Sequence, residues 1–241
     1  MARNVTQDRC NKGMECESCT HTTNPLLTGI NVESRSTLDS KRTVTFFKQG
    51  DLLFREGLYP SGLLCLNKGK VMVAKKDAYE NKVVIGLQKE VSFLGIADFI
   101  TGKPYQSDCY ALEDCTECMI KRNHVHKMMN DNKFFMKNVL EEIATQFHQS
   151  NLRLLNHSKK HMQSRLADAL YFLYDVFGMK EDGVTLDVYL KRKDLASLSN
   201  MNVSNVIRHL ATLHKEGVIA TSNKSIAITN LSRLEGIKNF I

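Results

Sequence analysis

The sequence of 241 residues contains no tryptophan, only three prolines and no apolar run of transmembrane length. A helix needs about 20 consecutive apolar residues to span a bilayer, so no membrane association is expected. The first 19 residues lack the apolar core of a secretory signal, which predicts a cytoplasmic protein. There is also no nucleophile–base motif, phosphate-binding loop or dinucleotide-binding fingerprint, and an enzyme is therefore not expected.

The composition is typical of a globular protein, with 42% hydrophobic and 24% charged residues. The length allows one large domain or two modest domains, each with its own core. The formal net charge of +7 suits a phosphate-bearing partner, although a basic surface is often only solvated. Seven cysteines are many for a cytoplasmic chain, where disulfides are disfavoured.

Residues 191–219 predict two short helices joined by a tight turn. The apolar side of the first helix consists of Leu195, Ala196 and Leu198. Residues 199–202 are polar and turn-forming, and Asn202 can cap the second helix. Gly217 is well placed to end that helix in the left-handed conformation.

The second helix is predicted to have an apolar face and a DNA-reading face. Its apolar positions at helical spacing are Val203, Val206, Ile207, Leu210 and Leu213. Ser204, Asn205 and Arg208 fall on the opposite side near the helix start, where a recognition helix contacts base edges. The predicted DNA-contacting residues are Lys193, Asn202, Ser204, Asn205, Arg208 and Lys224.

Helical hairpins also occur in domains that bind no nucleic acid. Here, residues 218–220 and 226–228 predict two strands around a polar turn immediately after the hairpin. A helix-turn-helix followed by such strands is a winged helix-turn-helix, and this combination favours DNA binding.

The rest of the chain divides into sections of different character. Residues 1–30 are an irregular cysteine-containing segment, and residues 31–130 are the predicted β-roll domain, beginning with a short helix at 31–40. Short strand-like runs separated by glycine-containing turns predict a β-roll or barrel. These runs are residues 44–47, 52–54, 63–66, 71–73 and 83–87.

A long helix is predicted to link the two domains. Residues 133–157 carry an apolar stripe without proline or glycine, inside a section that we assign to residues 131–158. The stripe can pack within the chain or against a second copy in a coiled coil. A homodimer is favoured, because winged regulators usually read two half-sites related by a two-fold axis. Residues 159–241 are assigned to DNA binding, and the fold class is α+β.

This layout resembles the CRP/FNR family of bacterial transcription regulators over nearly the whole chain. The resemblance is carried by the run KQGDLLFREG at residues 48–57, by Gly69, by the long helix and by the winged helix-turn-helix. It implies an N-terminal cyclic-nucleotide-binding-like β-roll, a dimerisation helix and a C-terminal DNA-binding domain. It also implies binding to a palindromic promoter site, with contact to RNA polymerase.

The roll departs from the cyclic-nucleotide binders of the family. Gly95 is followed by Ile96, where those proteins have glutamate for the ribose. Gln106 precedes Ser107, where they have arginine for the cyclic phosphate. A buried phosphate would lack its bidentate charged partner, so no cyclic AMP binding is expected.

The recognition helix departs from the family as well. Arg208 matches the arginine that reads guanine in many members. Ser204 replaces a glutamate that reads cytosine, and Ile207 stands where the FNR branch has serine. The half-site is therefore expected to differ from the usual one.

The cysteines resemble those of the FNR branch, which senses oxygen with a [4Fe–4S] cluster. Cys16 and Cys19 form a C-x2-C pair, which can place two thiolates on one metal. In the run ALEDCTECMI, Cys118 takes the place of the family's late ligand. Cys10 precedes the pair, whereas the third N-terminal ligand of FNR follows it. The expected ligand set is Cys10, Cys16, Cys19 and Cys118, with Cys115 and Cys109 as alternates.

The implied mechanism is that an intact cluster orders the N-terminus and supports dimerisation, whereas oxygen or nitric oxide destroys it. A zinc site or a thiol–disulfide switch would use the same groups. A haem or a small organic effector held in the roll is a further alternative. Cys65 is expected to be an ordinary core residue.

Overall fold

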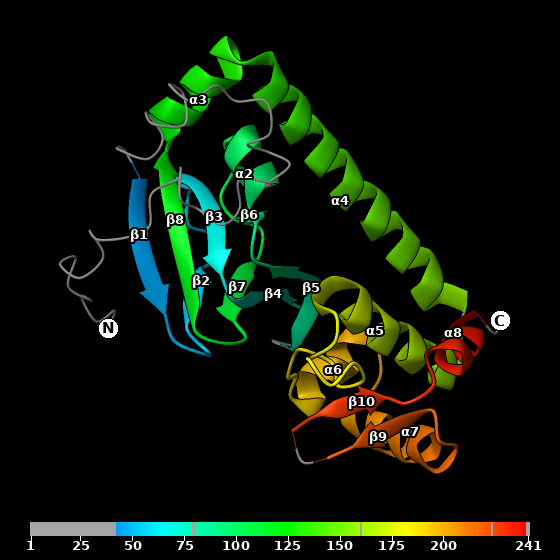
Figure 1. The fold of residues 1–241 in the computed structure, drawn as a ribbon. Coiled ribbons are helices and arrows are strands. Elements are labelled where there is room, and N and C mark those ends of the chain that lie inside the picture. Colours follow the sequence, from blue (N-terminus) through cyan, green and yellow to red (C-terminus); the bar gives the residue numbers. More distant parts are fainter. Residues whose placement is uncertain (1–41, 79–80, 160, 223, 240–241) are drawn as a thin grey trace.

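The structure, a computed structural model, describes residues 42–78, 81–159, 161–222 and 224–239. The segment predicted for residues 1–30 and the helix predicted for residues 31–40 lie outside these residues. The elements follow in the order β1 (Arg42–Phe47), β2 (Leu52–Phe54), β3 (Gly62–Lys68), β4 (Lys70–Lys76), β5 (Lys82–Lys89), β6 (Ser92–Leu94), α2 (Ile96–Thr101), β7 (Asp108–Ala111), β8 (Cys115–Lys121), α3 (Arg122–Asp131), α4 (Lys133–Lys159), α5 (Met162–Phe177), α6 (Arg192–Leu198), α7 (Val203–Lys215), β9 (Ile219–Thr221), β10 (Ile226–Ile228) and α8 (Leu231–Asn239). Figure 1 shows a β-rich N-terminal part, a long helix and a helical C-terminal part, which is the predicted α+β class.

Strands β1 to β8 form the β-roll as two antiparallel four-stranded sheets (Figure 1). One sheet has the strand order β1-β8-β3-β6, and the other has the order β2-β7-β4-β5. The five strand-like runs predicted between residues 44 and 87 are all strands, β1 to β5. The sequence pattern does not predict β6, β7 or β8, because they are short or carry acidic, threonine and cysteine residues that obscure the alternation of polar and apolar side chains.

The space between the two sheets is filled by side chains that alternate with outward-facing ones along each strand. The buried members are Phe54, Leu64, Leu66, Val71, Leu94, Tyr105, Cys109, Ala111 and Cys115. The turn from β3 to β4 requires glycine, because Gly69 has a φ of +104° and a Cβ there would lie 2.6 Å from the Cys115 sulfur. The start of β8 therefore packs directly against this turn.

A second apolar cluster lies on the outer face of the β1-β8-β3-β6 sheet, beneath α3 and the start of α4. Its buried members are Leu63, Phe93, Ile96, Phe99, Ile120, Val125, Met128, Phe135 and Val139. Helix α4 spans 27 residues, in agreement with the helix predicted at 133–157. Figure 1 shows it running from α3 along one side of the molecule to α5. Among the described helices, none combines the length and the apolar character that crossing a membrane requires.

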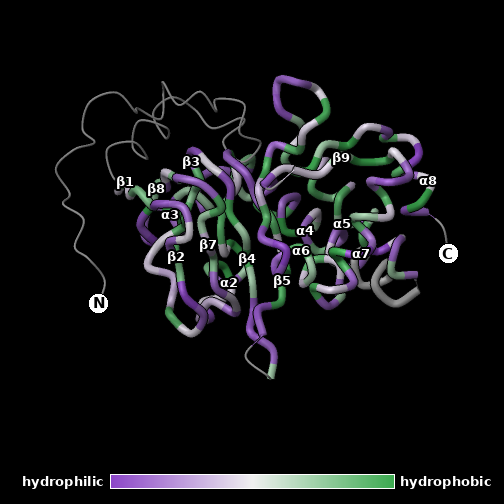
Figure 2. Tube along the Cα trace, turned by 90° about the horizontal axis from the view of Figure 1, so that it is seen from below, coloured by the Kyte–Doolittle hydropathy of each residue, from purple (hydrophilic) through white to green (hydrophobic). Residues whose placement is uncertain are grey.

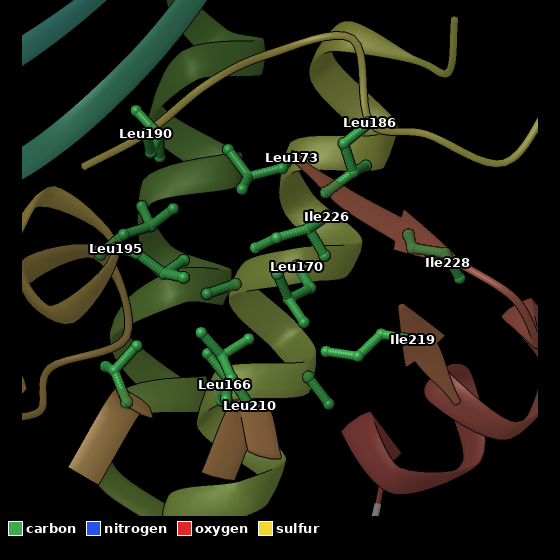
Figure 3. Packing of buried hydrophobic residues seen from close by; sticks show 14 of the residues in the cluster. Leu166, Leu170, Leu173, Leu186, Leu190, Leu195, Leu210, Ile219, Ile226 and Ile228 are labelled. Atoms are coloured by element: carbon green, nitrogen blue, oxygen red, sulfur yellow. The ribbon is translucent and has the colours of Figure 1, made fainter. Parts of the chain in front are cut away.

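Helices α5 to α8 and the hairpin β9–β10 build the C-terminal domain around a leucine-rich core (Figure 3). Leu166, Leu170 and Leu173 of α5 are at most 2% exposed and form the centre of this core. Strands β9 and β10 pair antiparallel with Ile226 opposite Thr221, which confirms the predicted hairpin.

The C-terminal domain packs against the β4–β5 edge of the roll, and Figure 2 shows the two parts side by side. The roll contributes Met72, Val84 and Leu87 to the apolar core of the C-terminal domain. The backbone N–H of Val84 donates a hydrogen bond of 2.7 Å to Ser197 Oγ in α6. Lys70 Nζ lies 2.8 Å from Asp187 and 3.3 Å from Glu113, and the lysine side chain is only 11% exposed. Apolar, hydrogen-bond and charged contacts thus all fix the C-terminal domain to the roll.

Candidate DNA-binding surface and cysteine sites

The turn between α6 and α7 fixes where the second helix begins. Asn202 Oδ1 accepts a hydrogen bond of 2.8 Å from the backbone N–H of Asn205, which confirms the predicted N-cap. Asn200 has a positive φ of 51°, a conformation that asparagine tolerates better than most residues. Gly217 has a φ of +66° just after α7, as predicted for the end of that helix.

Helix α7 is held by a narrow apolar stripe. Val206, Leu210 and Leu213 are at most 4% exposed and recur at positions i, i+4 and i+7. The prediction that Val203 and Ile207 belong to this face is wrong, because they are 37% and 55% exposed. These two side chains flank the stripe on its solvent side, so the helix buries a narrower face than its apolar pattern predicts. Ile207 consequently stands at the surface and can contact a thymine methyl group.

The exposed start of α7 carries the predicted base-reading residues. Ser204 and Arg208 are exposed one helical turn apart, and Asn205 is partly exposed. Arg208 Nη2 donates a hydrogen bond of 3.0 Å to Asn205 Oδ1, which ties the guanidinium to the helix start. The remaining N–H groups of Arg208 are sufficient for bidentate contact with guanine. The Ser204 hydroxyl can donate to or accept from a base or a phosphate.

Basic residues flank this surface on two other elements. Lys193 on α6 and Lys224 in the turn between β9 and β10 are both exposed. Lysines at such positions suit contacts to the phosphate backbone, which position a protein on a duplex. Burial, and to a lesser extent the Arg208 charge, lower the pKa of His209. His209 is therefore neutral at neutral pH, and the lysines and Arg208 supply the positive charge.

Of the proposed cluster ligands, only Cys118 lies within the described residues; Cys10, Cys16 and Cys19 fall outside them. Cys118 lies two residues before Ile120 in β8 and therefore shares its outward face. Its sulfur lies 3.6 Å from Arg42 Nη1. Within the described part of the chain, no group of three or more histidine, cysteine or acidic side chains is arranged to hold a metal ion.

The alternates Cys109 and Cys115 face the interior of the roll, on the opposite side of the sheet from Cys118. They are 0% and 2% exposed and belong to the core between the sheets. The Cys115 thiol donates to the backbone carbonyls of Lys70 and Glu113. Burial raises the pKa of both thiols, which favours their protonated forms. Neither side chain is placed to act together with Cys118 on one metal centre.

Cys65 has a neighbour that its sequence context does not reveal. It lies in β3, and in the β3–β8 ladder it is directly opposite Cys118. As predicted, it packs against apolar side chains, those of the outer cluster. Its pairing depends on strand register, which nothing in the run LLCLN specifies.

A cavity of about 430 Å³ lies between the roll and the helices α4 and α5. Its charged wall residues are Lys89, Asp98, Glu142 and Asp175, and no arginine occurs among the described residues that line it. Ser107 belongs to the wall, but Gln106 is not part of it and is exposed. Burial raises the pKa of Asp98, while a backbone hydrogen bond from Gln106 partly opposes this. Three carboxylates against one ammonium make the wall unfavourable for an anion.

The opposite side of α4 exposes apolar side chains. Leu140 and Phe147 are 60% and 68% exposed, and Ala144 lies exposed between them. These residues recur at positions i, i+4 and i+7, as in the seam of a coiled coil. They face away from Glu142 and Gln146, which line the cavity.

Two family models match the chain. The cyclic nucleotide-binding domain matches residues 44–132, and the Crp-like helix-turn-helix domain matches residues 164–237. The chain belongs to the CRP/FNR family. It is a transcription regulator of the CRP/FNR type, a family of regulators rather than enzymes.

Known proteins resemble this CRP/FNR regulator along most of their length. The "Anaerobic regulatory protein" of Bacillus subtilis is 26% identical over 188 residues, covering 76% of this chain and 78% of that protein. The "Global nitrogen regulator" of Synechococcus elongatus is 23% identical over 197 residues, covering 76% and 84%. The structure of FixK2 from Bradyrhizobium japonicum has a TM-score of 0.74 at 16% identity, covering 83% of this chain and 98% of that one.

Proposed function

We propose that this CRP/FNR regulator binds palindromic promoter DNA as a homodimer, contacts RNA polymerase there and responds to a redox or gas signal. The observation that carries the DNA-binding part is the solvent-exposed start of α7, with Arg208 tied to Asn205 and Ser204 one turn away. The flanking Lys193 and Lys224 support phosphate contacts.

The exposed stripe of α4 supports the homodimer. In a single chain, Leu140 and Phe147 leave apolar surface in contact with water, which is unfavourable. In a two-fold homodimer, α4 of the second copy would cover both side chains. Two C-terminal domains related in this way present two recognition helices, as a palindromic site requires.

The DNA-binding proposal is tested by selecting sites from a pool of random duplexes and measuring affinity for the enriched site. Arg208→Ala is expected to cost about 1–3 kcal/mol of specific binding and to relax the choice of one base pair in each half-site. Arg55→Ala is the matched control, because Arg55 is an exposed arginine on the roll. Enrichment of no sequence in any redox state, or equal losses in both variants, would count against this use of α7.

For the signal, we propose a [4Fe–4S] cluster held by Cys10, Cys16, Cys19 and Cys118. Cys118 fits this role because it lies on the outer face of the roll beneath α3, with Arg42 beside its sulfur. When bound, the cluster supplies sensitivity to oxygen and nitric oxide. Cys118 then ties the N-terminal segment to the sheet that supports α3 and α4. The name of the Bacillus subtilis relative, which refers to anaerobic regulation, agrees with such a signal.

Anaerobically purified protein provides the test of the cluster. It is expected to contain iron and labile sulfide and to absorb broadly near ~400 nm. Cys118→Ser should remove the absorption, whereas Cys109→Ser should retain it because Cys109 faces the roll interior. Wild-type protein without iron and sulfide, or equal loss in both variants, would refute the assignment.

The alternative signal is a small effector in the cavity between the roll and α4. Its carboxylate-rich wall, without arginine among the described lining residues, favours a neutral or cationic effector over cyclic AMP. A ligand that raises the melting temperature, with no effect of iron or oxygen, would favour this alternative. A comparable rise with cyclic AMP would contradict the reasoning about the wall.

A further inference from the structure

The β1-β8-β3-β6 sheet places two cysteines side by side on its outer face. One row of side chains crosses the four strands and consists of Val44, Cys118, Cys65 and Phe93. Directly opposite residues of antiparallel strands point to the same face. Phe93 belongs to the outer cluster and Cys65 packs against it, which confirms the face independently of the register.

The spacing of such a pair suits a disulfide. Opposite residues in antiparallel strands have Cα atoms about 4.5 or 5.5 Å apart, depending on whether the pair is hydrogen-bonded. Both values lie within the range of about 4.4–6.8 Å that disulfides span. A bond between Cys65 and Cys118 therefore requires little movement of β3 or β8. None of the four described cysteines is in a disulfide in the structure.

The surroundings of the pair favour reaction of these two thiols with one another. Cys65 is partly exposed, so a small oxidant can reach it, whereas Cys118 is 7% exposed and directly beside it. The Arg42 guanidinium lies 3.6 Å from the Cys118 sulfur, and Cys65 is the only cysteine directly opposite Cys118 in the described part of the sheet. Cys109 and Cys115 point into the roll interior and cannot compete from that side of the sheet.

We propose that Cys65 and Cys118 form a redox modification site that closes into a cross-strand disulfide when a peroxide is the oxidant. The Cys65 sulfur attacks one peroxide oxygen, so that an S–O bond forms and the O–O bond breaks. The other oxygen leaves as water, and Cys65 becomes a sulfenic acid. The Cys118 sulfur then attacks the Cys65 sulfur, so that the S–S bond forms, the S–O bond breaks and a second water leaves. Two thiols lose two electrons and two protons, and one peroxide becomes two waters.

The site needs only these two cysteines and does not depend on an iron–sulfur cluster. Where Cys118 also serves as a cluster ligand, the disulfide removes it from the ligand set. Oxidation by peroxide would then hold the protein in its cluster-free state until a thiol reductant reopens the bond.

The test uses the reduced full-length protein, treated with hydrogen peroxide, alkylated and digested with trypsin. The disulfide is expected to link the peptide of residues 56–68 to that of residues 90–121, and fragmentation should assign it to Cys118 rather than Cys109 or Cys115. Dithiothreitol added before alkylation should abolish the link.

Variants identify the reacting pair. Cys65→Ser and Cys118→Ser should each lose the linked peptides, while Cys109→Ser and a combined Cys10→Ser, Cys16→Ser and Cys19→Ser variant should keep them. Cys118→Ser should also accumulate the Cys65 sulfenic acid, trapped with dimedone, by about tenfold or more because its neighbouring nucleophile is gone. A link from Cys118 to any other cysteine, or Cys65 fully alkylatable after peroxide, would overturn the proposal. Neither outcome depends on whether the protein binds iron or DNA.

Discussion

Replacing Phe147 with glutamate should dissociate the proposed homodimer, and the structure gives the approximate magnitude. Phe147 is 68% exposed on the side of α4 that faces away from the roll cavity. A buried aromatic side chain covers about 150–250 Å², so covering the exposed part at about 25 cal/mol per Å² contributes about 3 kcal/mol per chain. A two-fold dimer gains this twice, about 6 kcal/mol as an upper limit. Losing even half of it raises the dissociation constant of the dimer by about 100-fold.

Sedimentation velocity over a range of protein concentrations measures this change. The chain offers a matched control in Phe134→Glu, because Phe134 lies on the same helix and is 63% exposed. The two positions are thirteen steps apart along the helix, a rotation of about 220°, so they point to different sides of α4. Phe147→Glu should be monomeric and lose cooperative binding to the full palindrome, whereas Phe134→Glu should remain dimeric. Equal dissociation of both variants, or a monomeric wild type, would refute the assignment of the seam.

Three further variants test other parts of the structure. Lys70→Met should lower the free energy of unfolding by about 1–2 kcal/mol, because Asp187 and Glu113 lose their shared cation. The cost stays modest because both carboxylates are more than 40% exposed and therefore remain solvated. An unchanged melting temperature in thermal unfolding would contradict a structural role for this contact. Burial and the Arg208 charge lower the pKa of His209, so the folded state resists protonation and the free energy of unfolding should fall as the pH drops below about 6.5. Urea unfolding between about pH 7.5 and 5.5 measures this fall, which should be smaller in His209→Gln. An identical pH dependence in wild type and variant would exclude His209 as its cause. Asn202→Ala should cost about 1 kcal/mol of stability and weaken specific DNA binding through loss of the cap, whereas full stability would show that the cap hydrogen bond is dispensable.

The recognition helix α7 shows which structural features can be predicted from local sequence pattern. The cap at Asn202, the left-handed Gly217 and the exposed Arg208 follow from nearest neighbours in the chain, and all three are present in the structure. The exposure of Ile207 does not follow in this way. How wide a face of α7 is buried depends on how α5 and β9 pack against it, and periodicity carries no information on the size of the covering surface.

The cysteines show the limit of the same reasoning. Their spacing suggests a metal or redox function, and the resemblance favours Cys118 as the late ligand, with Cys115 and Cys109 as alternates. Strand alternation and register separate them, since Cys115 points into the roll while Cys118 points outward. Cys65, fifty-three residues earlier in the sequence, becomes the neighbour of Cys118 only when β3 pairs with β8.

The sequence by itself determined the class of this protein: an all-β roll or barrel, a long helix and a winged helix-turn-helix follow from local periodicity, turn residues and caps, and the family resemblance selects the roll. Only the tertiary structure decided which side chains of these elements are available for function. In the structure, Cys118 lies opposite Cys65, and carboxylates line the cavity. One apolar stripe of α4 is exposed, and Ile207 lies beside Arg208 at the surface. The reason is physical, since the conformation of each element follows mainly from interactions within a few residues, whereas the burial and pairing of its side chains depend on partners far away in the chain.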